Sequence, residues 1–326
     1  MNFAHLIKEI GRGEHGARAL SEDDAYQLWA AMMDGGVPDL ELGAILLALR
    51  VKGESLAELL GFHRALAERL HRLAAPPGEL RPLVIPSYNG ARHQPNLLPL
   101  LALLLRRFGV PVLIHGTLNG NGRTATAYIL RELGIMPCAT PAQAQAALEK
   151  DGLAFVPTAT LTPGLTTLLA LRERLGVRSS AHTLAKLIAP FGSRGVRLVS
   201  VSHPAYLERM REFLAAIGEH ALLLRGTEGE AFANPKRRPQ LEYFFDGRGT
   251  VLFEAETGPL RMLPELPSAI DAAATAAWIN RVMHGEVPVP RTIANQLACC
   301  LYACAYTQDI NQAKAIVAAE AARLVA

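Results

Sequence analysis

Residues 20–66 read LSEDDAYQLWAAMMDGGVPDLELGAILLALRVKGESLAELLGFHRAL. Ser55 and Glu58 form a complete Ser-x-x-Glu capping box, which predicts that a helix begins there. In the preceding stretch, apolar residues such as Ile45 and Leu49 follow the 3.6-residue period of an amphipathic helix. Nothing in the first 74 residues has the pattern of a strand. The sequence therefore predicts a purely helical beginning.

Beyond a connector rich in proline and glycine at 76–82, short apolar runs alternate with helical segments. The predicted strands are Leu83–Pro86, Val110–His115, Ala154–Pro157, Val196–Val201, Ala221–Leu224, Leu241–Phe245 and Thr250–Phe253. The last two are expected to pair as a hairpin around Asp246–Gly249. One intervening helix should open at Thr140, with Pro141 in its first turn. This alternation predicts a mostly parallel sheet covered by helices, whereas residues 165–189 again read as helical.

The composition suits a globular protein with one large or two modest domains, because half of the 326 residues are hydrophobic. No run of 18 apolar residues lacks charge, and the polar start does not resemble a signal peptide. We therefore expect no membrane association and a cytoplasmic location. Three of the four cysteines lie in the apolar stretch 297–306, without a second pair at metal spacing. They are expected to be core residues.

The net charge of +3 is unevenly distributed. Residues 172–197 contain six basic side chains and one acidic side chain, so this segment carries +5 and the rest of the chain −2. Such clustering produces a local positive field that suits a phosphate-rich partner. An ordinary solvated surface is the alternative interpretation.

Three motifs give the chain a family resemblance. They are ALRVKGES at 48–55, LRERLGVRSSAHTLAKLIAPFG at 171–192 and IHG at 114–116. Together with the segment around the first motif, they resemble anthranilate phosphoribosyltransferases and pyrimidine nucleoside phosphorylases, which share one fold. The resemblance implies an α/β protein with a substrate cleft between two domains. These would be a small helical dimerisation domain, 1–74 with 165–190, and a large domain with a central, mostly parallel sheet, 80–164 with 191–326.

The loop that should bind the substrate's pyrophosphate departs from the family pattern. In the family it reads G-T-G-G-D-G, and its glycines let backbone N–H groups approach the pyrophosphate closely. Here residues 86–91 read PSYNGA. Pro86 has no N–H to donate, and Tyr88 would fill space that the diphosphate needs. The N-I-S-T signature that follows this loop in the family is also absent.

The charged groups of the catalytic site are replaced as well. In the family a loop reading G-x-D-G-x-D-E supplies an Asp-Glu pair for magnesium, and those positions here are Ala231 and Phe232. A lysine of the family is Ile114 in this chain. Magnesium and cations stabilise the departing pyrophosphate, and losing one such contact typically costs about 100- to 1000-fold in rate. We therefore expect no useful phosphoribosyl transfer by the usual mechanism, and no catalytic residue is assigned.

Part of the family's site is nevertheless retained. The resemblance places the former substrate cleft at Tyr88, Asn89, Gly90, His115 and Gly116. Arg172 matches the arginine that contacts anthranilate in the family. His115, at a strand end, is equally compatible with a buried structural role. Tyr88 could stack on a base or simply fill the loop.

Four further motifs resemble one particular branch of the family, the YbiB-like branch. They are IPSYNGAR at 85–92, SSAHTLAKL at 179–187, SVSHPAY at 200–206 and RGTEGEAFANP at 225–235. That branch shares the fold, lacks the transferase activity and is associated with nucleic-acid binding as a dimer. The resemblance therefore implies that this chain is a homodimer that binds DNA or RNA, single- or double-stranded, independently of sequence.

The basic residues suited to bind phosphates are Arg92, Arg123, Arg172, Arg178, His182, Lys186, Lys236, Arg237 and Arg238. Arg178, His182 and Lys186 recur at intervals of four, on one face of a helix expected to begin near Ser179. The free N–H groups of that helix start would also favour phosphate. His182 could instead be a surface or capping histidine. The run 236–238 directly follows the loop that has lost its metal ligands.

The sequence thus favours a catalytically degenerate, nucleic-acid-binding member of the family that needs neither metal nor cofactor. The alternative is an active anthranilate phosphoribosyltransferase, or a related transferase, using Mg²⁺ with phosphoribosyl pyrophosphate. A third interpretation is a scaffold whose basic surface binds an acidic protein.

Overall fold

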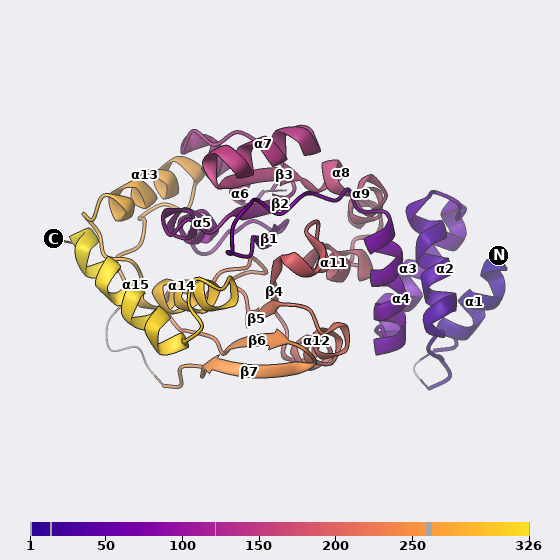
Figure 1. The fold of residues 1–326 in the computed structure, drawn as a ribbon. Coiled ribbons are helices and arrows are strands. Elements are labelled where there is room, and N and C mark those ends of the chain that lie inside the picture. Colours follow the sequence, from indigo (N-terminus) through magenta and orange to yellow (C-terminus); the bar gives the residue numbers. More distant parts are fainter. Residues whose placement is uncertain (1, 14, 121, 259–262, 326) are drawn as a thin grey trace. The chain divides into compact units, whose positions relative to one another are not determined.

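The computed structural model of the chain describes residues 2–13, 15–120, 122–258 and 263–325 (Figure 1). The chain divides into two compact units: a helical unit, Met1–His71 with Thr158–Ile188, and an α/β unit, Arg72–Pro157 with Ala189–Ala326. The segment 158–164 lies in the helical unit, although the sequence suggested the large domain. Its backbone explains this placement, because the His71 N–H donates to the Leu161 carbonyl at 2.8 Å.

The helical unit is built from two separate stretches of the chain. The first provides α1 (Phe3–Ile10), α2 (Glu22–Met33), α3 (Asp39–Lys52) and α4 (Leu56–Glu68). The second provides α8 (Thr158–Leu161), α9 (Pro163–Ala170), α10 (Arg172–Leu175), α11 (Ser180–Leu184) and the 3-10 turn η1 (Ala185–Leu187). No helix in the described part of the chain is long and apolar enough to cross a membrane.

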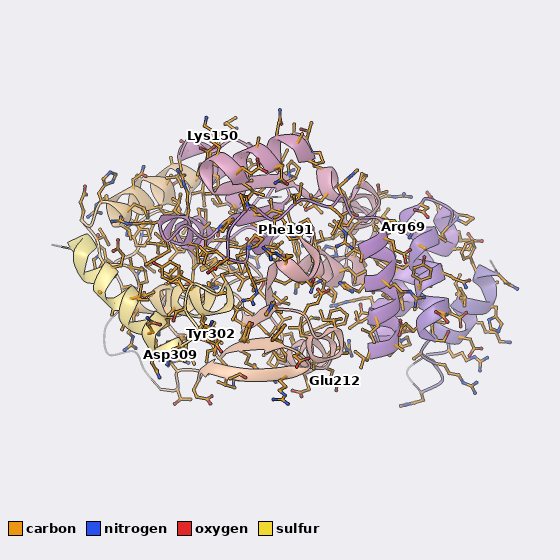
Figure 2. All side chains as sticks on the ribbon, viewed as in Figure 1. Arg69, Lys150, Phe191, Glu212, Tyr302 and Asp309 are labelled. Carbon is orange, nitrogen blue, oxygen red and sulfur yellow. The ribbon has the colours of Figure 1, made fainter. Side chains whose placement is uncertain are left out.

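Helices α2 and α4 approach each other closely. A Cβ atom at Gly61 would lie only 2.3 Å from the Glu22 carbonyl oxygen, so the contact requires glycine. The rings of Trp29 and Phe62 then pack with centroids 4.7 Å apart. The predicted capping box at Ser55 is confirmed and holds the start of α4. Arg69, which ends α4, is labelled in Figure 2.

The α/β unit contains a seven-stranded sheet in the order β3-β2-β1-β4-β5-β6-β7 (Figure 1). The strands are β1 (Leu83–Ser87), β2 (Val112–Gly116), β3 (Leu153–Pro157), β4 (Val196–Val201), β5 (Ala221–Arg225), β6 (Leu241–Phe245) and β7 (Arg248–Phe253). The first five are parallel, and β6 and β7 run antiparallel at one edge. The predicted mostly parallel sheet is therefore confirmed. Because parallel strands share their carboxyl ends, the loops after β1, β2, β4 and β5 leave from one edge.

One face of the sheet carries the main hydrophobic core. Alternate strand residues, such as Leu83 and Ile85 of β1, pack there against five helices. These are α5 (Leu98–Arg107), α6 (Thr126–Glu132), α13 (Ala272–Met283), α14 (Arg291–Ala303) and α15 (Ile310–Val325). Helix α7 (Pro141–Asp151) packs beside β3, and α12 (Pro204–Ile217) packs on β4 to β6. The predicted start of α7 is confirmed, because the Thr140 hydroxyl accepts the Gln143 N–H.

All four cysteines are buried with free thiols, as expected for core residues. Burial raises the pKa of Cys299, Cys300 and Cys304, so these thiols stay protonated. Tyr302 of α14, labelled in Figure 2, packs edge-on against Tyr243 of β6, and the ring centroids are 5.4 Å apart. Helix α14 is thereby fixed against the antiparallel edge of the sheet.

The predicted hairpin of β6 and β7 is confirmed, with a tighter turn than expected. Only Asp246 and Gly247 lie outside the strands, and both have positive φ, 51° and 74°. Two consecutive positive φ values are typical of the two-residue turns that match strand twist. Strand β7 therefore begins at Arg248, two residues before the predicted start.

Candidate functional site

The loop after β5 sends one carboxylate into the loop after β1. Glu230 is fully buried, and its carboxylate accepts the Ser87 hydroxyl at 2.5 Å. The same carboxylate accepts the backbone N–H groups of Asn89 and Gly90, both at 2.8 Å. Burial raises the pKa of Glu230, and these hydrogen bonds oppose the rise. The loop after β1 is thus built around an internal acceptor.

A second carboxylate of the same loop binds the continuation of the β1 loop. Glu228 accepts the backbone N–H groups of Arg92, His93 and Gln94, at 3.1, 2.9 and 3.0 Å. One guanidinium nitrogen of Arg123, from the loop after β2, lies 4.0 Å from this carboxylate. Five backbone N–H groups of residues 89–94 therefore point at two side chains of the chain itself. We call this arrangement the amide nest.

Glycine makes the close approach of the two loops possible. Gly229 has a φ of +91°, and a Cβ atom there would lie 2.5 Å from the side-chain nitrogen of Asn89. That nitrogen donates to the Gly229 carbonyl at 2.9 Å. Gly90 also has a positive φ, +66°, which turns consecutive N–H groups toward the carboxylates.

The two positions at which the family resemblance implies metal ligands lie in the hydrophobic core. Ala231 and Phe232 have no exposed surface and belong to the core cluster under the sheet. Gln296 of α14 binds the backbone on both sides of Phe232, accepting from the Ala233 N–H at 2.7 Å and donating to the Ala231 carbonyl at 3.0 Å. Among the described residues, no three His, Cys, Asp or Glu side chains gather as metal ligands do. The side chains at these two positions therefore offer no oxygen ligand for magnesium.

His115, assigned to the former substrate cleft, is completely buried on β2. Neither ring nitrogen has a hydrogen-bond partner in the described structure, and burial lowers the pKa of His115 to about 3. The ring is therefore neutral and inaccessible to a ligand. Its neighbour Gly116 is required by packing, since a Cβ atom would lie 1.6 Å from the Ser87 carbonyl oxygen. Tyr88 in the adjacent loop is partly exposed.

The predicted basic residues of the helical unit interact with one another. The ring nitrogen Nδ1 of His182 accepts the Ser179 N–H at 3.3 Å, so His182 caps the short helix α11. Burial, together with the charges of Arg178, Arg172 and Lys186, lowers the pKa of His182 to about 4. His182 is therefore neutral near pH 7, and only three of these four residues carry positive charge.

Lys186 is the most perturbed cation of this group. Burial and the charge of Arg178 lower the pKa of Lys186 to about 8, against the opposing effect of Glu54. The helix start expected to bind phosphate contributes little, because α11 spans only Ser180–Leu184. We refer to Arg172, Arg178 and Lys186 as the helical cation cluster.

The other predicted cations lie in the α/β unit, in a different structural setting. Lys236 and Arg237 are exposed, and Arg237 donates to the Gly258 carbonyl at 2.9 Å. Arg238 is fixed to the edge of the sheet, with Glu256 at 3.6 Å and the Phe253 ring at 5.0 Å. The run 236–238 therefore offers two exposed cations and one that is held in an ion pair.

A groove of about 570 Å³ lies beside this run and reaches the amide nest. Its charged lining residues are Arg211, Arg225, Arg237, Arg238, Glu228, Glu242 and Glu256. Arg211 is held by Glu242, with nitrogen–oxygen distances of 2.7 and 2.9 Å. Arg225 is exposed and lines the groove. The groove thus combines neutralised pairs with two available arginines, Arg225 and Arg237.

The structure groups the predicted site residues into two sets. Arg172, Arg178, His182 and Lys186 belong to the helical unit, whereas Arg92, Arg123 and residues 236–238 belong to the α/β unit. Sequence reasoning missed Glu228 and Glu230, which are the central acceptors of the amide nest. The available signal was the pair of acidic residues flanking Gly229, in a loop from which the metal ligands had been lost.

Comparison with known proteins places this architecture in a family. Residues 4–70 match the helical bundle domain of the glycosyl transferase family. The chain is 46% identical to the uncharacterized protein YbiB of Escherichia coli K12 over 318 residues, which covers 97% of this chain and 99% of YbiB. It is 27% identical to an anthranilate phosphoribosyltransferase of Methanosphaerula palustris, covering 94% of this chain and 91% of that enzyme.

Solved structures confirm the predicted fold. The crystal structure of anthranilate phosphoribosyltransferase from Thermus thermophilus matches 100% of this chain and 97% of that chain, with a TM-score of 0.76 at 24% identity. Both proteins therefore combine a helical bundle with an α/β unit around a mostly parallel sheet. This chain belongs to the anthranilate phosphoribosyltransferase-like family.

Proposed function

We propose that this chain is a family member without phosphoribosyltransferase activity that binds nucleic acid through phosphate contacts. The observation that carries the proposal is the amide nest, in which Glu230 occupies N–H groups of the loop that corresponds to the family's pyrophosphate loop. A buried carboxylate at this place competes with any pyrophosphate for the same donors and repels its charge.

The loss of the metal-binding positions supports the same conclusion. Ala231 and Phe232 offer no oxygen ligand, and Mg²⁺ requires oxygen ligands in near-octahedral geometry. Placing carboxylates at these two positions would bury charge in the hydrophobic core. These two positions of the loop are therefore part of the core, and their side chains supply no ligand for magnesium.

The cation distribution supports phosphate as the ligand. In the helical cation cluster, Arg178 lowers the pKa of Lys186, so these positive charges are close enough to repel each other. Repulsion of this kind is relieved when an anion binds between cations. Lys236 and Arg237 add two exposed cations on the α/β unit. Contacts of cations with phosphates do not depend on base sequence.

The proposal includes a homodimer. Helix α3 presents an exposed apolar stripe, in which Leu40 is 83%, Leu47 49% and Val51 73% exposed. These residues recur at helical spacing along one face, and such a stripe is typical of a surface that another chain covers. Two copies would double the number of phosphate contacts on one nucleic acid strand. We place the protein in the cytoplasm.

Fluorescence anisotropy with a labelled oligo(dT) of about 30 nucleotides and a duplex of the same length tests the proposal. We expect submicromolar binding at 50 mM salt, a steep loss of affinity at higher salt and little dependence on sequence. Undetectable binding to both probes at 50 mM salt contradicts the nucleic-acid function.

A second assay tests the loss of transferase activity independently. The protein is incubated with phosphoribosyl pyrophosphate, Mg²⁺ and anthranilate, and the decrease of anthranilate fluorescence is followed. We expect no product above background. Turnover, or rescue of a tryptophan auxotroph, would overturn the proposed loss of activity without bearing on nucleic-acid binding.

A further inference from the structure

The two carboxylates of the amide nest differ in accessibility. Glu230 is fully buried, whereas the Glu228 side chain is 13% exposed and lines the groove beside residues 236–238. Glu230 is also held by the Ser87 hydroxyl in addition to backbone N–H groups. Glu228 is held only by the N–H groups of three consecutive residues and by the nearby Arg123, among the contacts described above. Of the two carboxylates, only that of Glu228 can be displaced from its N–H donors by an anion from solvent without opening the core.

The backbone at Glu228 is unfavourable for a residue with a side chain. Its φ is +53°, in the left-handed region that glycine adopts far more readily. Glu228 is one of three non-glycine residues with positive φ in the described chain, and one of the other two lies in the β6–β7 turn. The carboxylate contacts of Glu228 therefore hold a conformation that has an intrinsic cost.

Glu228 has one cationic side chain, Arg123, at ion-pair distance, and the exposed Arg92 follows in the same loop. Arg123 lies 4.0 Å from the carboxylate and also approaches the Gly90 carbonyl at 3.5 Å. Arg92 is exposed, and its own backbone N–H is one of the three donors. The Arg123 guanidinium is thus at the outer limit of an ion pair with Glu228, and the Arg92 guanidinium donates from Nε to the His93 ring at 3.0 Å. A more highly charged anion would match these groups better than a carboxylate does.

We propose that Glu228 is a replaceable internal anion and that a phosphate group displaces it from the backbone N–H groups of Arg92, His93 and Gln94. Phosphate enters through the groove of about 570 Å³, and Arg123 binds it from the side. Glu230 keeps its place, so the loop after β1 stays folded during the exchange. In the free protein the Glu228 carboxylate consequently occupies this anion site, and phosphate must compete with it for the same N–H groups.

Phosphate suits the vacated donors for geometric reasons. Three successive N–H groups in a turn form a concave site, and a tetrahedral phosphate presents three acceptor oxygens to it. Arg225 and Arg237 line the same groove and extend the positive surface away from the nest. The ligand is therefore a phosphate group on a larger molecule, either a terminal monoester or a phosphodiester of a strand. This site does not depend on whether the helical cation cluster binds nucleic acid.

The first measurement compares phosphate binding by three proteins in titration calorimetry. They are the wild type, Glu228→Gly and, as a control, Glu212→Gln, which removes one exposed carboxylate of α12 (Figure 2). We expect Glu228→Gly to bind inorganic phosphate about tenfold more tightly than the other two, because the internal competitor is gone. Equal affinities in all three proteins, or an equal gain in the control, would overturn the proposal.

The second measurement follows individual amides in the wild type by NMR. Phosphate should shift the signals of Arg92, His93 and Gln94 and leave those of Asn89 and Gly90 in place, because Glu230 holds the latter pair. Shifts confined to Asn89 and Gly90 contradict the assignment. Should Glu228→Gly fail to fold, Glu228→Gln removes the charge with the side-chain length retained, and a smaller gain is expected.

Oligonucleotides with and without a 5′-phosphate distinguish the two sources of phosphate. A gain of Glu228→Gly over wild type for the phosphorylated probe alone supports a terminal monoester. A gain for both probes supports a backbone phosphodiester. Absence of oligonucleotide binding, with the gain for inorganic phosphate intact, refutes the nucleic-acid function and leaves this site standing.

Discussion

The structure predicts that the three basic residues at 236–238 do not contribute equally to nucleic-acid binding. Lys236 and Arg237 are exposed, whereas Arg238 is paired with Glu256 and packed over Phe253. A cation that already has a carboxylate partner releases few counterions when it meets a phosphate. The double variant Lys236→Ala/Arg237→Ala should therefore reproduce nearly the whole effect of removing all three.

The size of the effect follows from counterion release. Each phosphate contact on a single strand contributes about 0.7 to the slope of log affinity against log salt, so losing two contacts lowers the slope by about 1.4. Between 50 and 200 mM salt, the wild type should then lose about sevenfold more affinity than the double variant. Arg238→Ala alone should leave the slope unchanged and lower the free energy of unfolding.

Anisotropy titrations of oligo(dT) at four salt concentrations measure the slopes directly. The matched control is Lys150→Ala/Arg248→Ala, which removes two exposed cations elsewhere on the same unit. Lys150 is labelled in Figure 2. An equal fall of the slope in the control would show that only net charge matters. An unchanged slope in Lys236→Ala/Arg237→Ala would remove this run from the interface, and a reduced slope in Arg238→Ala alone would refute the distinction drawn from the ion pair.

Three further predictions concern stability and activity. Glu230→Ala leaves two buried N–H groups without an acceptor, while the Ser87 hydroxyl can still donate to the Thr126 hydroxyl at 2.7 Å, and urea unfolding should show a loss of about 3 to 5 kcal/mol, with a smaller loss for Glu230→Gln. Ala231→Asp/Phe232→Glu should lower the thermal midpoint and yield no Mg²⁺-dependent transferase activity, since both positions face the core; measurable turnover contradicts this. For pH dependence, the pKa values of His182 and His115 are about 4 and about 3, both below 6.5, so the unfolded chain binds more protons and stability falls as pH drops from 6.5 toward 3. His182→Asn keeps an acceptor for the Ser179 N–H and should make this fall shallower, and an identical pH profile would show that His182 does not contribute.

Much of the fold was predictable because its signals are local. The capping box of Ser55, the Thr140 cap and the alternating apolar runs each involve residues within a few positions of one another. Predicted strand ends were wrong by one or two residues where pairing with a neighbouring strand sets the boundary. Strand β7, for example, begins at Arg248 because the turn before it needs only two residues. The core role of the cysteines also followed from local composition.

The site was less predictable because it depends on contacts between distant residues. Glu230 lies about 140 positions from Asn89 and Gly90, and no local pattern indicates that the two loops meet. In a glycine-rich loop, the sequence alone does not distinguish a glutamate that is a buried acceptor from one that is exposed to solvent. Arg238 was predicted as a phosphate contact because it belongs to a basic run that directly follows the loop without metal ligands, whereas its actual position is fixed by Glu256 and by Phe253 of strand β7. The pKa of Lys186 likewise depends on Glu54, which is distant in the sequence.

The tethering of Glu230 has a thermodynamic consequence. A soluble ligand stabilises its binding loops in proportion to its concentration, so such loops loosen when the ligand is depleted. An acceptor carried by the chain itself is present at a fixed effective concentration that dilution does not change. The order of the loop after β1 is therefore a constant of the fold and is independent of the metabolic supply of any phosphorylated substrate. The loop after β1 therefore keeps one structure whether or not a phosphorylated ligand is present.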